Sequence, residues 1–332
     1  MQQRIITNKN VLVTGGGGFI GSNLCDTLIN QGNKVVCLDN FITGKRENIQ
    51  HLLSNANFKL VEGDICNLED CKKSLDGVEI VLHQAALGSI PRSIKDPIKT
   101  NSINVDGFLN ILVSSKDAGI KRIVYASSSS VYGTSKELPK QEEIIGEPLS
   151  PYAITKRVDE LYAKVFSDLY GLEIIGLRYF NVYGKKQDPT SVYAAVIPKF
   201  ISSLIQHESP IINGDGSYSR DFTFVEDVVQ INQLAALTEN KDALNNVYNV
   251  AAGGRYTINR LYELIHKNLS KYDINIEKIQ PIYGEVRSGD IPHSQASIEK
   301  AKDKLKYEPK YKLEEGIEST VEWYLKNLKQ NN

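Results

Sequence analysis

Four consecutive glycines near the amino terminus constrain the fold of this chain more than any other feature. They follow a short apolar run and precede an amphipathic segment, an order that predicts a strand, a tight turn and a helix. Glycine at such a turn removes the Cβ atoms that would keep a bulky anion away from the backbone amides at the helix start. The spacing fits Gly15-x-x-Gly18-x-x-Gly21 or Gly16-x-Gly18-x-x-Gly21, and the sequence leaves both open.

A second predicted strand ends in an acidic residue at a distance typical of dinucleotide sites. The apolar run 34–38 leads directly into Asp39, which follows the glycines by about 20 residues. A carboxylate at this place accepts hydrogen bonds from the hydroxyls of an adenosine ribose and disfavours a 2′-phosphate. The glycine turn and Asp39 together predict a bound dinucleotide, with NAD favoured over NADP.

The charge balance excludes several classes of partner. The 332 residues include 39 Lys and Arg and 40 Asp and Glu, which gives a net charge of −1. No broad electrostatic field therefore favours nucleic acid or an anionic membrane, and local charges must hold any anionic ligand. The amino terminus lacks the apolar core of a signal peptide, and no segment approaches the roughly 18 apolar residues of a membrane span. We expect a cytoplasmic protein.

The cysteines give no sign of a metal site. None of the four belongs to a Cys-x-x-Cys pair or has histidines nearby at metal-ligand spacing. They are Cys25, Cys37, Cys66 and Cys71. We expect reduced thiols and no metal.

Strand and helix patterns alternate through the first half of the chain. Beyond the second strand, four more are expected at 58–64, 78–83, 121–126 and 173–178. Asp96 and Pro97 begin a long helix with one apolar face between two of these strands. Such alternation requires a parallel sheet covered on both faces, so we predict an α/β fold with a Rossmann-type doubly wound parallel sheet.

The regular alternation weakens after residue 180. Turn signals at 213–216 and 252–254 then separate short elements instead of βαβ units. We expect a dinucleotide-binding domain over residues 1–180 and a smaller α/β substrate lobe over 181–332, some of whose segments return to the first domain. With no flexible linker between them, the lobes should pack closely around a cleft.

A tyrosine and a lysine share one face of a predicted helix. Ser150 is a suitable N-cap and Pro151 a suitable first residue, which places Tyr152 in the first turn and Lys156 one turn later, about 6 Å along the axis. The helix N-terminus, the lysine charge and an oxidised nicotinamide would each favour the phenolate. A tyrosine in this setting can accept or return a hydroxyl proton near neutral pH.

Together these motifs resemble the extended short-chain dehydrogenase/reductases over almost the whole chain. The matching residues are the glycine turn, 39–41, 64–65, Ser128 with 131–133, Tyr152 with Lys156, and 178–184. Within that family the chain is most similar to the UDP-N-acetylglucosamine 4-epimerases of bacterial O-antigen and capsule pathways. The strings that carry this closer similarity are 83–93, 194–199 and 287–290.

The resemblance implies a reaction without net redox change. Ser128 would bind the sugar O4 while Tyr152 removes its proton, and Lys156 would fix the tyrosine and the nicotinamide ribose. A tightly held NAD would take the C4 hydride and return it to the other face after the 4-keto sugar has swung about its diphosphate. The swing requires an anchored UDP, for which Arg220 and Arg287 offer bidentate donors.

The resemblance also implies two sets of contacts. For the cofactor these are Gly15, Gly18, Phe19, Ile20, Gly21, Asp39, Asn40, Phe41, Gly44, Asp64, Ile65, Gln84, Ala85, Ala86, Asn104, Tyr152, Lys156 and Tyr179. For the substrate they are Gly88, Ser89, Ser128, Ser129, Tyr152, Asn181, Ala195, Val196, Lys199, Arg220, Arg287, Asp290 and Ser294. In the family that this chain resembles, the enzymes confined to non-acetylated sugars carry a tyrosine at the position that Ser294 occupies here. A UDP-N-acetylhexosamine is therefore the expected substrate.

Other functions on this scaffold stay open to different degrees. Nucleotide-sugar dehydratases carry an Asp-Glu pair where this chain has Ser129 and Ser130, which argues against dehydration. Non-catalytic NAD-binding redox sensors commonly lose the tyrosine or the lysine, and this chain keeps both. UDP-glucose 4-epimerase and UDP-N-acetylglucosaminuronic acid 4-epimerase remain alternatives, because sequence separates them poorly.

A homodimer is also implied by the resemblance, formed by the helices that begin near Asp96 and Ser150. Leu161, Val165 and Leu169 supply an apolar stripe on the second of these helices. The same stripe would also suit a helix that only covers its own sheet.

Overall fold

The computed structural model describes residues 4–191, 193–286 and 291–328. Within them, seven parallel strands form one sheet with the order β11-β6-β5-β4-β1-β2-β3. The strands are β1 Asn10–Thr14, β2 Lys34–Asp39, β3 Phe58–Glu62, β4 Ile80–His83, β5 Arg122–Ser128, β6 Glu173–Tyr179 and β11 Val247–Val250. The expected doubly wound parallel sheet is confirmed.

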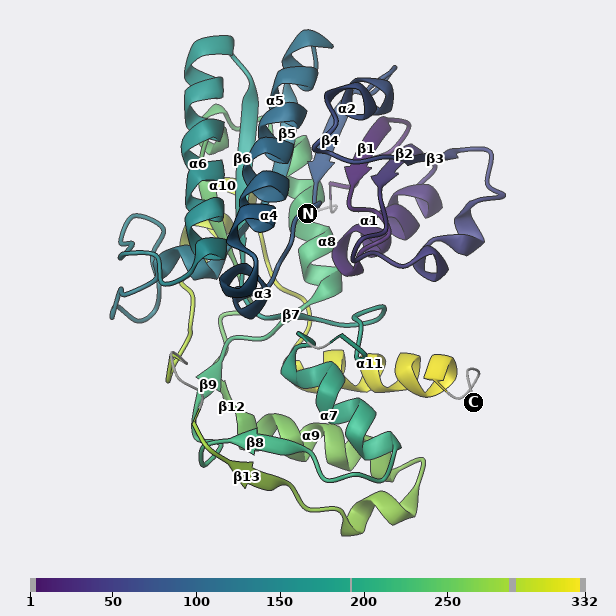
Figure 1. The fold of residues 1–332 in the computed structure, drawn as a ribbon, viewed down its shortest axis with the longest axis vertical. Helices are drawn as coiled ribbons and strands as arrows, with labels where there is room; N and C mark the ends of the chain where they lie inside the picture. Colours follow the sequence, from purple (N-terminus) through teal and green to yellow (C-terminus); the bar gives the residue numbers. More distant parts are fainter. Residues whose placement is uncertain (1–3, 192, 287–290, 329–332) are drawn as a thin grey trace.

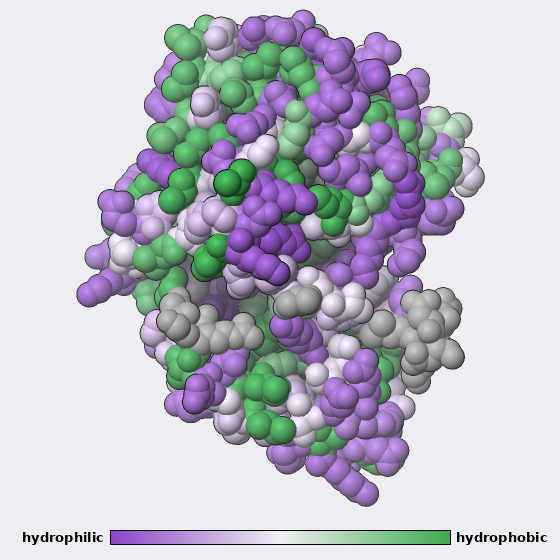
Figure 2. All heavy atoms as spheres, in the orientation of Figure 1, coloured by the Kyte–Doolittle hydropathy of each residue, from purple (hydrophilic) through white to green (hydrophobic). Residues whose placement is uncertain are grey.

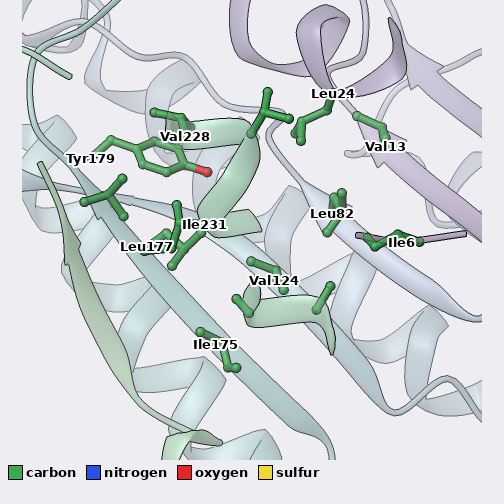
Figure 3. Close-up of a cluster of buried hydrophobic side chains, with 14 of the residues drawn as sticks. Ile6, Val13, Leu24, Leu82, Val124, Ile175, Leu177, Tyr179, Val228 and Ile231 are labelled. Carbon is green, nitrogen blue, oxygen red and sulfur yellow. The ribbon is translucent and has the colours of Figure 1, made fainter. Parts of the chain in front are cut away.

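Helices cover both faces of this sheet (Figure 1). On one face lie α1 Phe19–Asn30, α8 Val225–Leu237 and α10 Glu299–Leu305. On the other lie α2 Leu68–Ser74, α5 Gly107–Asp117 and α6 Pro151–Tyr170. Figure 3 shows the first of the two cores, where Val13, Leu82 and Val124 from the strands lie near Val228 and Ile231 of α8.

A third hydrophobic core belongs to the elements that lie below the sheet in Figure 1. Its helices are α7 Val196–Ile205, α9 Ile258–Ser270 and α11 Leu313–Leu328. Three short strand pairs accompany them: β7 Val182–Tyr183 with β10 Thr223–Phe224, β9 Ser219–Arg220 with β12 Tyr256–Thr257, and β8 Ile211–Asn213 with β13 Ile282–Gly284. We call this part the second lobe and the sheet with its helices the first lobe.

Two details differ from the sequence-based expectations. The seventh strand, β11, lies beyond the six expected strands and pairs with β6 after an intervening stretch that includes the second-lobe helix α7. The long helix expected from Asp96 is divided into α4 Pro97–Asn101, a π-helical turn Ser102–Asp106 (η3) and α5. In that turn the side-chain amide of Asn104 accepts from the Leu87 backbone and donates to the Thr155 hydroxyl. These bonds accompany the change from α-helical to π-helical hydrogen bonding.

The remaining short elements lie at the edges of the first lobe and in the second. They are α3 Ile90–Lys95 and the 3₁₀ turns η1 Arg46–Asn48, η2 Gln50–Leu52, η4 Ser129–Tyr132, η5 Lys241–Ala243 and η6 Ile274–Lys278. Of the helices in the described parts of the chain, none has the length and apolar character needed to cross a bilayer.

Candidate functional site

The structure decides between the two glycine registers in favour of Gly15, Gly18 and Gly21. Gly15 has φ +67°, and the Gly18 amide donates to its carbonyl at 3.0 Å where α1 begins. A Cβ on Gly21 would lie 2.1 Å from the same carbonyl oxygen. Gly16 instead faces the sulfur atoms of Cys37 and Cys25, away from this turn. The turn therefore requires glycine at 15 and 21, and a Cβ on Gly18 would make a tight contact of 3.1 Å with the Gly15 carbonyl.

Asp39 ends β2 beside this turn. Its Oδ2 accepts the Gly17 amide at 2.8 Å and its Oδ1 accepts the Phe41 amide at 2.7 Å. Burial raises the pKa of this carboxyl, and the two amides oppose that rise. Each carboxylate oxygen has a second acceptor position, so the group can still accept from ribose hydroxyls.

The glycine turn and Asp39 line one cavity at the carboxyl end of the sheet. Of the expected cofactor contacts, the following line it: Gly15, Gly18, Phe19, Ile20, Gly21, Asp39, Asn40, Gly44, Asp64, Ile65, Gln84, Ala85 and Ala86. The backbone comes close together here, since a Cβ on Gly15 would lie 2.8 Å from the Ala85 backbone. A glycine cradle at a helix N-terminus with a ribose-accepting carboxylate fits a dinucleotide.

Two expected cofactor contacts outside the lining, Asn104 and Tyr179, bond residues that line it. The Asn104 side chain accepts the Leu87 amide at 2.7 Å and donates to Thr155 of α6 at 3.0 Å. The Tyr179 hydroxyl donates to Gln84 at 3.0 Å. Phe41 lies beneath the guanidinium of Arg46, 4.4 Å from the ring centre.

Sequence reasoning missed residues that close this cavity from another part of the chain. Lys186 and Asp188 line it, although both follow β7 in sequence. Lys186 Nζ donates to Asp26 at 2.6 Å, and Lys45 Nζ donates to Asp188 at 2.9 Å. No local pattern signals these contacts, because their partners are 160 and 143 residues away.

A second cavity lies between the two lobes. Of the expected substrate contacts, Gly88, Ser89, Tyr152, Asn181, Ala195, Val196, Lys199 and Arg220 line it. Sequence reasoning missed Asn213 and the aromatic residues Tyr193, Tyr218 and Phe222 of the same lining. Asn213 ends β8 and the three aromatic residues lie in turns and loops, where the sequence shows no binding motif.

The two cavities meet at Gly88, which lines both. A Cβ on Gly88 would lie 4.0 Å from the Tyr152 hydroxyl. Tyr152 is held at the start of α6 as expected, because Ser150 caps the helix by accepting the Ala153 amide at 3.1 Å. The phenol therefore stands at the junction of the two cavities.

Ser128 and Lys156 lie on β5 and α6. Ser128 is the last residue of β5, and its Oγ accepts the Ser130 amide at 3.1 Å where η4 begins. The η4 turn packs against α6. Neither Ser128 nor Ser129 lines the second cavity, and the ammonium of Lys156 points to Asp159 at 3.1 Å.

The residues expected to bind the diphosphate and to set the substrate specificity differ in where they lie. Arg220 lines the second cavity, and its guanidinium donates to the carbonyls of Ser219 and Pro292. Ser294 does not line the cavity, but its amide donates to Ser219 at 3.0 Å, so it lies beside the strand that carries Arg220. Arg287 and Asp290 lie outside the described residues.

A comparison with protein families matches most of the chain, from β1 to the end of β11. Residues 11–251 match the NAD dependent epimerase/dehydratase family. A UDP-glucuronate 4-epimerase from Thermodesulfobacterium geofontis is 33% identical over 96% of this chain and 96% of its own length.

Solved structures are similar over nearly the full length. The UDP-N-acetylglucosamine 4-epimerase of Methanobrevibacter ruminantium M1, in complex with UDP-N-acetylmuramic acid, is 42% identical with a TM-score of 0.89, over 97% of this chain and 99% of that one. The UDP-glucose 4-epimerase of Thermotoga maritima, with UDP-glucose, is 38% identical with a TM-score of 0.88, over 96% and 99%. The sequence and the fold thus agree on one family.

Proposed function

The chain belongs to the NAD-dependent epimerase/dehydratase family as an NAD-dependent UDP-sugar 4-epimerase, and on that premise we propose that it interconverts UDP-N-acetylglucosamine and UDP-N-acetylgalactosamine. The observation that carries the proposal is the junction of the two cavities at Gly88 and Tyr152. A proton acceptor between a dinucleotide cavity and a sugar cavity is what C4 oxidation needs.

Three side chains have the proposed catalytic roles. Tyr152 accepts the proton of the sugar O4 and later returns it, while Ser128 binds the same oxygen. Lys156, one turn beyond Tyr152, binds the nicotinamide ribose and supplies positive charge beside the phenol. NAD, when bound, supplies the acceptor and donor of the C4 hydride. The residues proposed to hold it are those of the first cavity's lining.

The sugar has to turn within the second cavity while its nucleotide stays in place. Lys199 and Arg220 line that cavity and carry the positive charge that a diphosphate needs. Small residues at the same lining, Gly88 and Ala195, leave space for the hexose to present its other face. Charged residues that can hold the diphosphate, together with small residues that leave room for the hexose to turn, support epimerisation.

The proposed preference for the acetylated sugars rests on one further residue, Ser294. The Ser294 amide bonds Ser219, the neighbour of the cavity-lining Arg220, and its small side chain is proposed to leave room for a 2-acetamido group. UDP-glucose and UDP-galactose should react more slowly. UDP-N-acetylglucosaminuronic acid and UDP-glucose are the competing substrates.

A homodimer is also part of the proposal. Large apolar residues are exposed on adjoining helices of the first lobe: Ile94, Ile98, Leu161, Val165 and Leu169. Figure 2 shows hydrophobic residues on the upper left of the molecule, where α6 lies in Figure 1. A second copy of the chain that packs the same face against it would cover these residues.

Incubation of the purified protein with each UDP-sugar, without added NAD, tests the function. Proton NMR should detect the C4 epimer of UDP-N-acetylglucosamine first, and that of UDP-glucose more slowly. Faster turnover of UDP-glucose or of the uronic acid would assign the enzyme to the competing substrate. Bound NAD without turnover of any UDP-sugar would indicate a redox sensor.

A further inference from the structure

The proposed catalytic lysine has a carboxylate partner on its own helix. Lys156 Nζ donates to Asp159 Oδ2 at 3.1 Å, one turn farther along α6. Both side chains are buried, with 2% and 1% of their surface exposed. Family resemblance assigned no role to Asp159, and it lines neither cavity.

Stability does not explain this pair. Asp159 Oδ1 is buried and has no hydrogen-bond partner among the described residues. An unsatisfied buried oxygen destabilises the folded state, and a buried ion pair offsets its own desolvation only when its remaining hydrogen bonds are satisfied. Two apolar side chains in place of the pair would serve the fold at least as well, so the pair points to a function.

The neighbouring acid on α6 is already neutralised by other residues. Glu160 accepts from Arg178 on β6 at 2.8 and 2.9 Å and from Arg157 at 3.0 Å. It also accepts the Ser127 hydroxyl at 2.7 Å. Its charge is therefore balanced by arginines and is not available to Lys156.

Arg178 on β6 is paired with Glu160, and His83 and Tyr125 on the other strands beneath α6 add no charge to the pair. Burial, helped by the positive charge of Lys156, lowers the pKa of His83 on β4 to about 3, so this imidazole is neutral at physiological pH. Burial raises the pKa of Tyr125 on β5 well above its usual value, and its phenol stays protonated. Burial raises the pKa of Asp159 to about 6, with Lys156 opposing the rise and Glu160 adding to it, so Asp159 is ionised at neutral pH and is the carboxylate bonded to Lys156.

We propose that Asp159 is a positioning residue that keeps the Lys156 ammonium charged and fixed beside Tyr152 and the nicotinamide ribose. The proposal rests on the role of Lys156 in the proposed function. An ammonium group has three N–H donors, so one bond to Asp159 leaves two for ribose hydroxyls. The carboxylate also offsets the cost of a buried positive charge next to an oxidised nicotinamide.

Asp159→Asn tests the charge with little change of shape. The amide retains an oxygen that can accept from Lys156, but the buried ammonium loses its counter-charge and should release its proton at lower pH. Asp159→Glu keeps the charge and should retain most of the wild-type behaviour. Asp168→Asn is the matched control, because Asp168 pairs with Lys164 on the same helix at 3.1 Å, with both side chains exposed.

The first measurement follows the lysine itself. Protein containing its NAD is prepared with lysines labelled with ¹³C at Cε, and the Lys156 signal is assigned by its loss in Lys156→Arg. We expect the titration midpoint of this signal to fall by about one pH unit or more in Asp159→Asn. Asp168→Asn should match the wild type. A midpoint that stays at or above the wild-type value in Asp159→Asn overturns the proposal.

The second measurement uses the reaction. In Asp159→Asn, kcat should fall steeply on the alkaline side, where the wild type is still active, while KM for the UDP-sugar changes little. A uniform loss of kcat at all pH values would indicate a structural role and contradict the proposal. If Asp159→Asn does not fold, Asp159→Ser repeats the loss of charge with a smaller side chain. The NMR titration does not depend on which UDP-sugar is the substrate, so an error in substrate assignment is distinguishable.

Discussion

Arg178 on β6 and Glu160 on α6 form a two-point ion pair in the interior of the first lobe. The two donor–acceptor distances are 2.8 and 2.9 Å, and the side chains are 1% and 3% exposed. Burial would raise the pKa of Glu160, but the bonds to Arg178 hold it below its usual value. Because α6 also carries Tyr152 and Lys156, this pair fixes the helix of the proposed catalytic residues to the sheet.

Arg178→Met should therefore lower the free energy of unfolding by about 3–5 kcal/mol, since it leaves a buried carboxylate without its main partner. Lys164→Met, which breaks an exposed pair on the same helix, should cost less than about 1 kcal/mol. Urea denaturation measures both values. Equal small losses in the two variants would show that the buried pair does not hold α6 in place.

Tyr152→Phe should lower kcat by roughly 10²-fold or more, because it removes the proposed proton acceptor and keeps the ring. Bound NAD should remain, and its content is read from the ratio of absorbance at 260 and 280 nm. Near-normal turnover of UDP-N-acetylglucosamine in this variant would remove Tyr152 from the mechanism.

Gly15→Ala should reduce the NAD content of the purified protein. Its new Cβ would lie 2.8 Å from the Ala85 backbone, at the wall of the cofactor cavity. Gly77→Ala is the control, because Gly77 has nearly the same φ, +69° against +67°, but only a distant contact at 3.9 Å. Both changes carry the backbone cost of a left-handed alanine, about 1–2 kcal/mol. Equal NAD contents in the two variants would contradict the proposed cradle.

Ser294→Tyr should change the substrate preference of the enzyme. If Ser294 faces the sugar as proposed, a phenol ring there would reduce the space for a 2-acetamido group, and kcat/KM for UDP-N-acetylglucosamine should fall by about 10-fold or more relative to UDP-glucose. Steady-state kinetics on both sugars give the ratio. An unchanged ratio would show that Ser294 does not control the sugar pocket.

His83 should make the protein less stable as the pH falls. Its folded pKa of about 3 is below its usual value of 6.5, so below about pH 6 the unfolded chain binds a proton that the folded chain does not. This group then removes about 1.4 kcal/mol of stability per pH unit. His83→Gln should make the slope between pH 6 and 4 shallower by about one proton, as measured by urea denaturation at several pH values. An identical slope would mean that the folded protein protonates His83.

Local stereochemistry makes part of the fold and of the site predictable from the sequence. The glycine turn, the acid at the end of β2 and the Ser150 cap each depend on neighbours within a few residues or one βαβ unit, so their sequence patterns predict them. The strand positions followed from apolar runs for the same reason. The long helix at Asp96 was predicted less well, since the π-helical turn at Asn104 depends on contacts with Leu87 and Thr155 from other elements.

The sequence by itself determined the class of fold, the dinucleotide turn and the tyrosine–lysine pair on one helix. Only the tertiary structure decided the glycine register, the seventh strand, the closure of the cofactor cavity by Lys186 and Asp188, and the burial of the Lys156–Asp159 pair. The physical reason is sequence distance. Lys186 contacts Asp26 across 160 residues, and whether Asp159 has another partner depends on every element packed around α6.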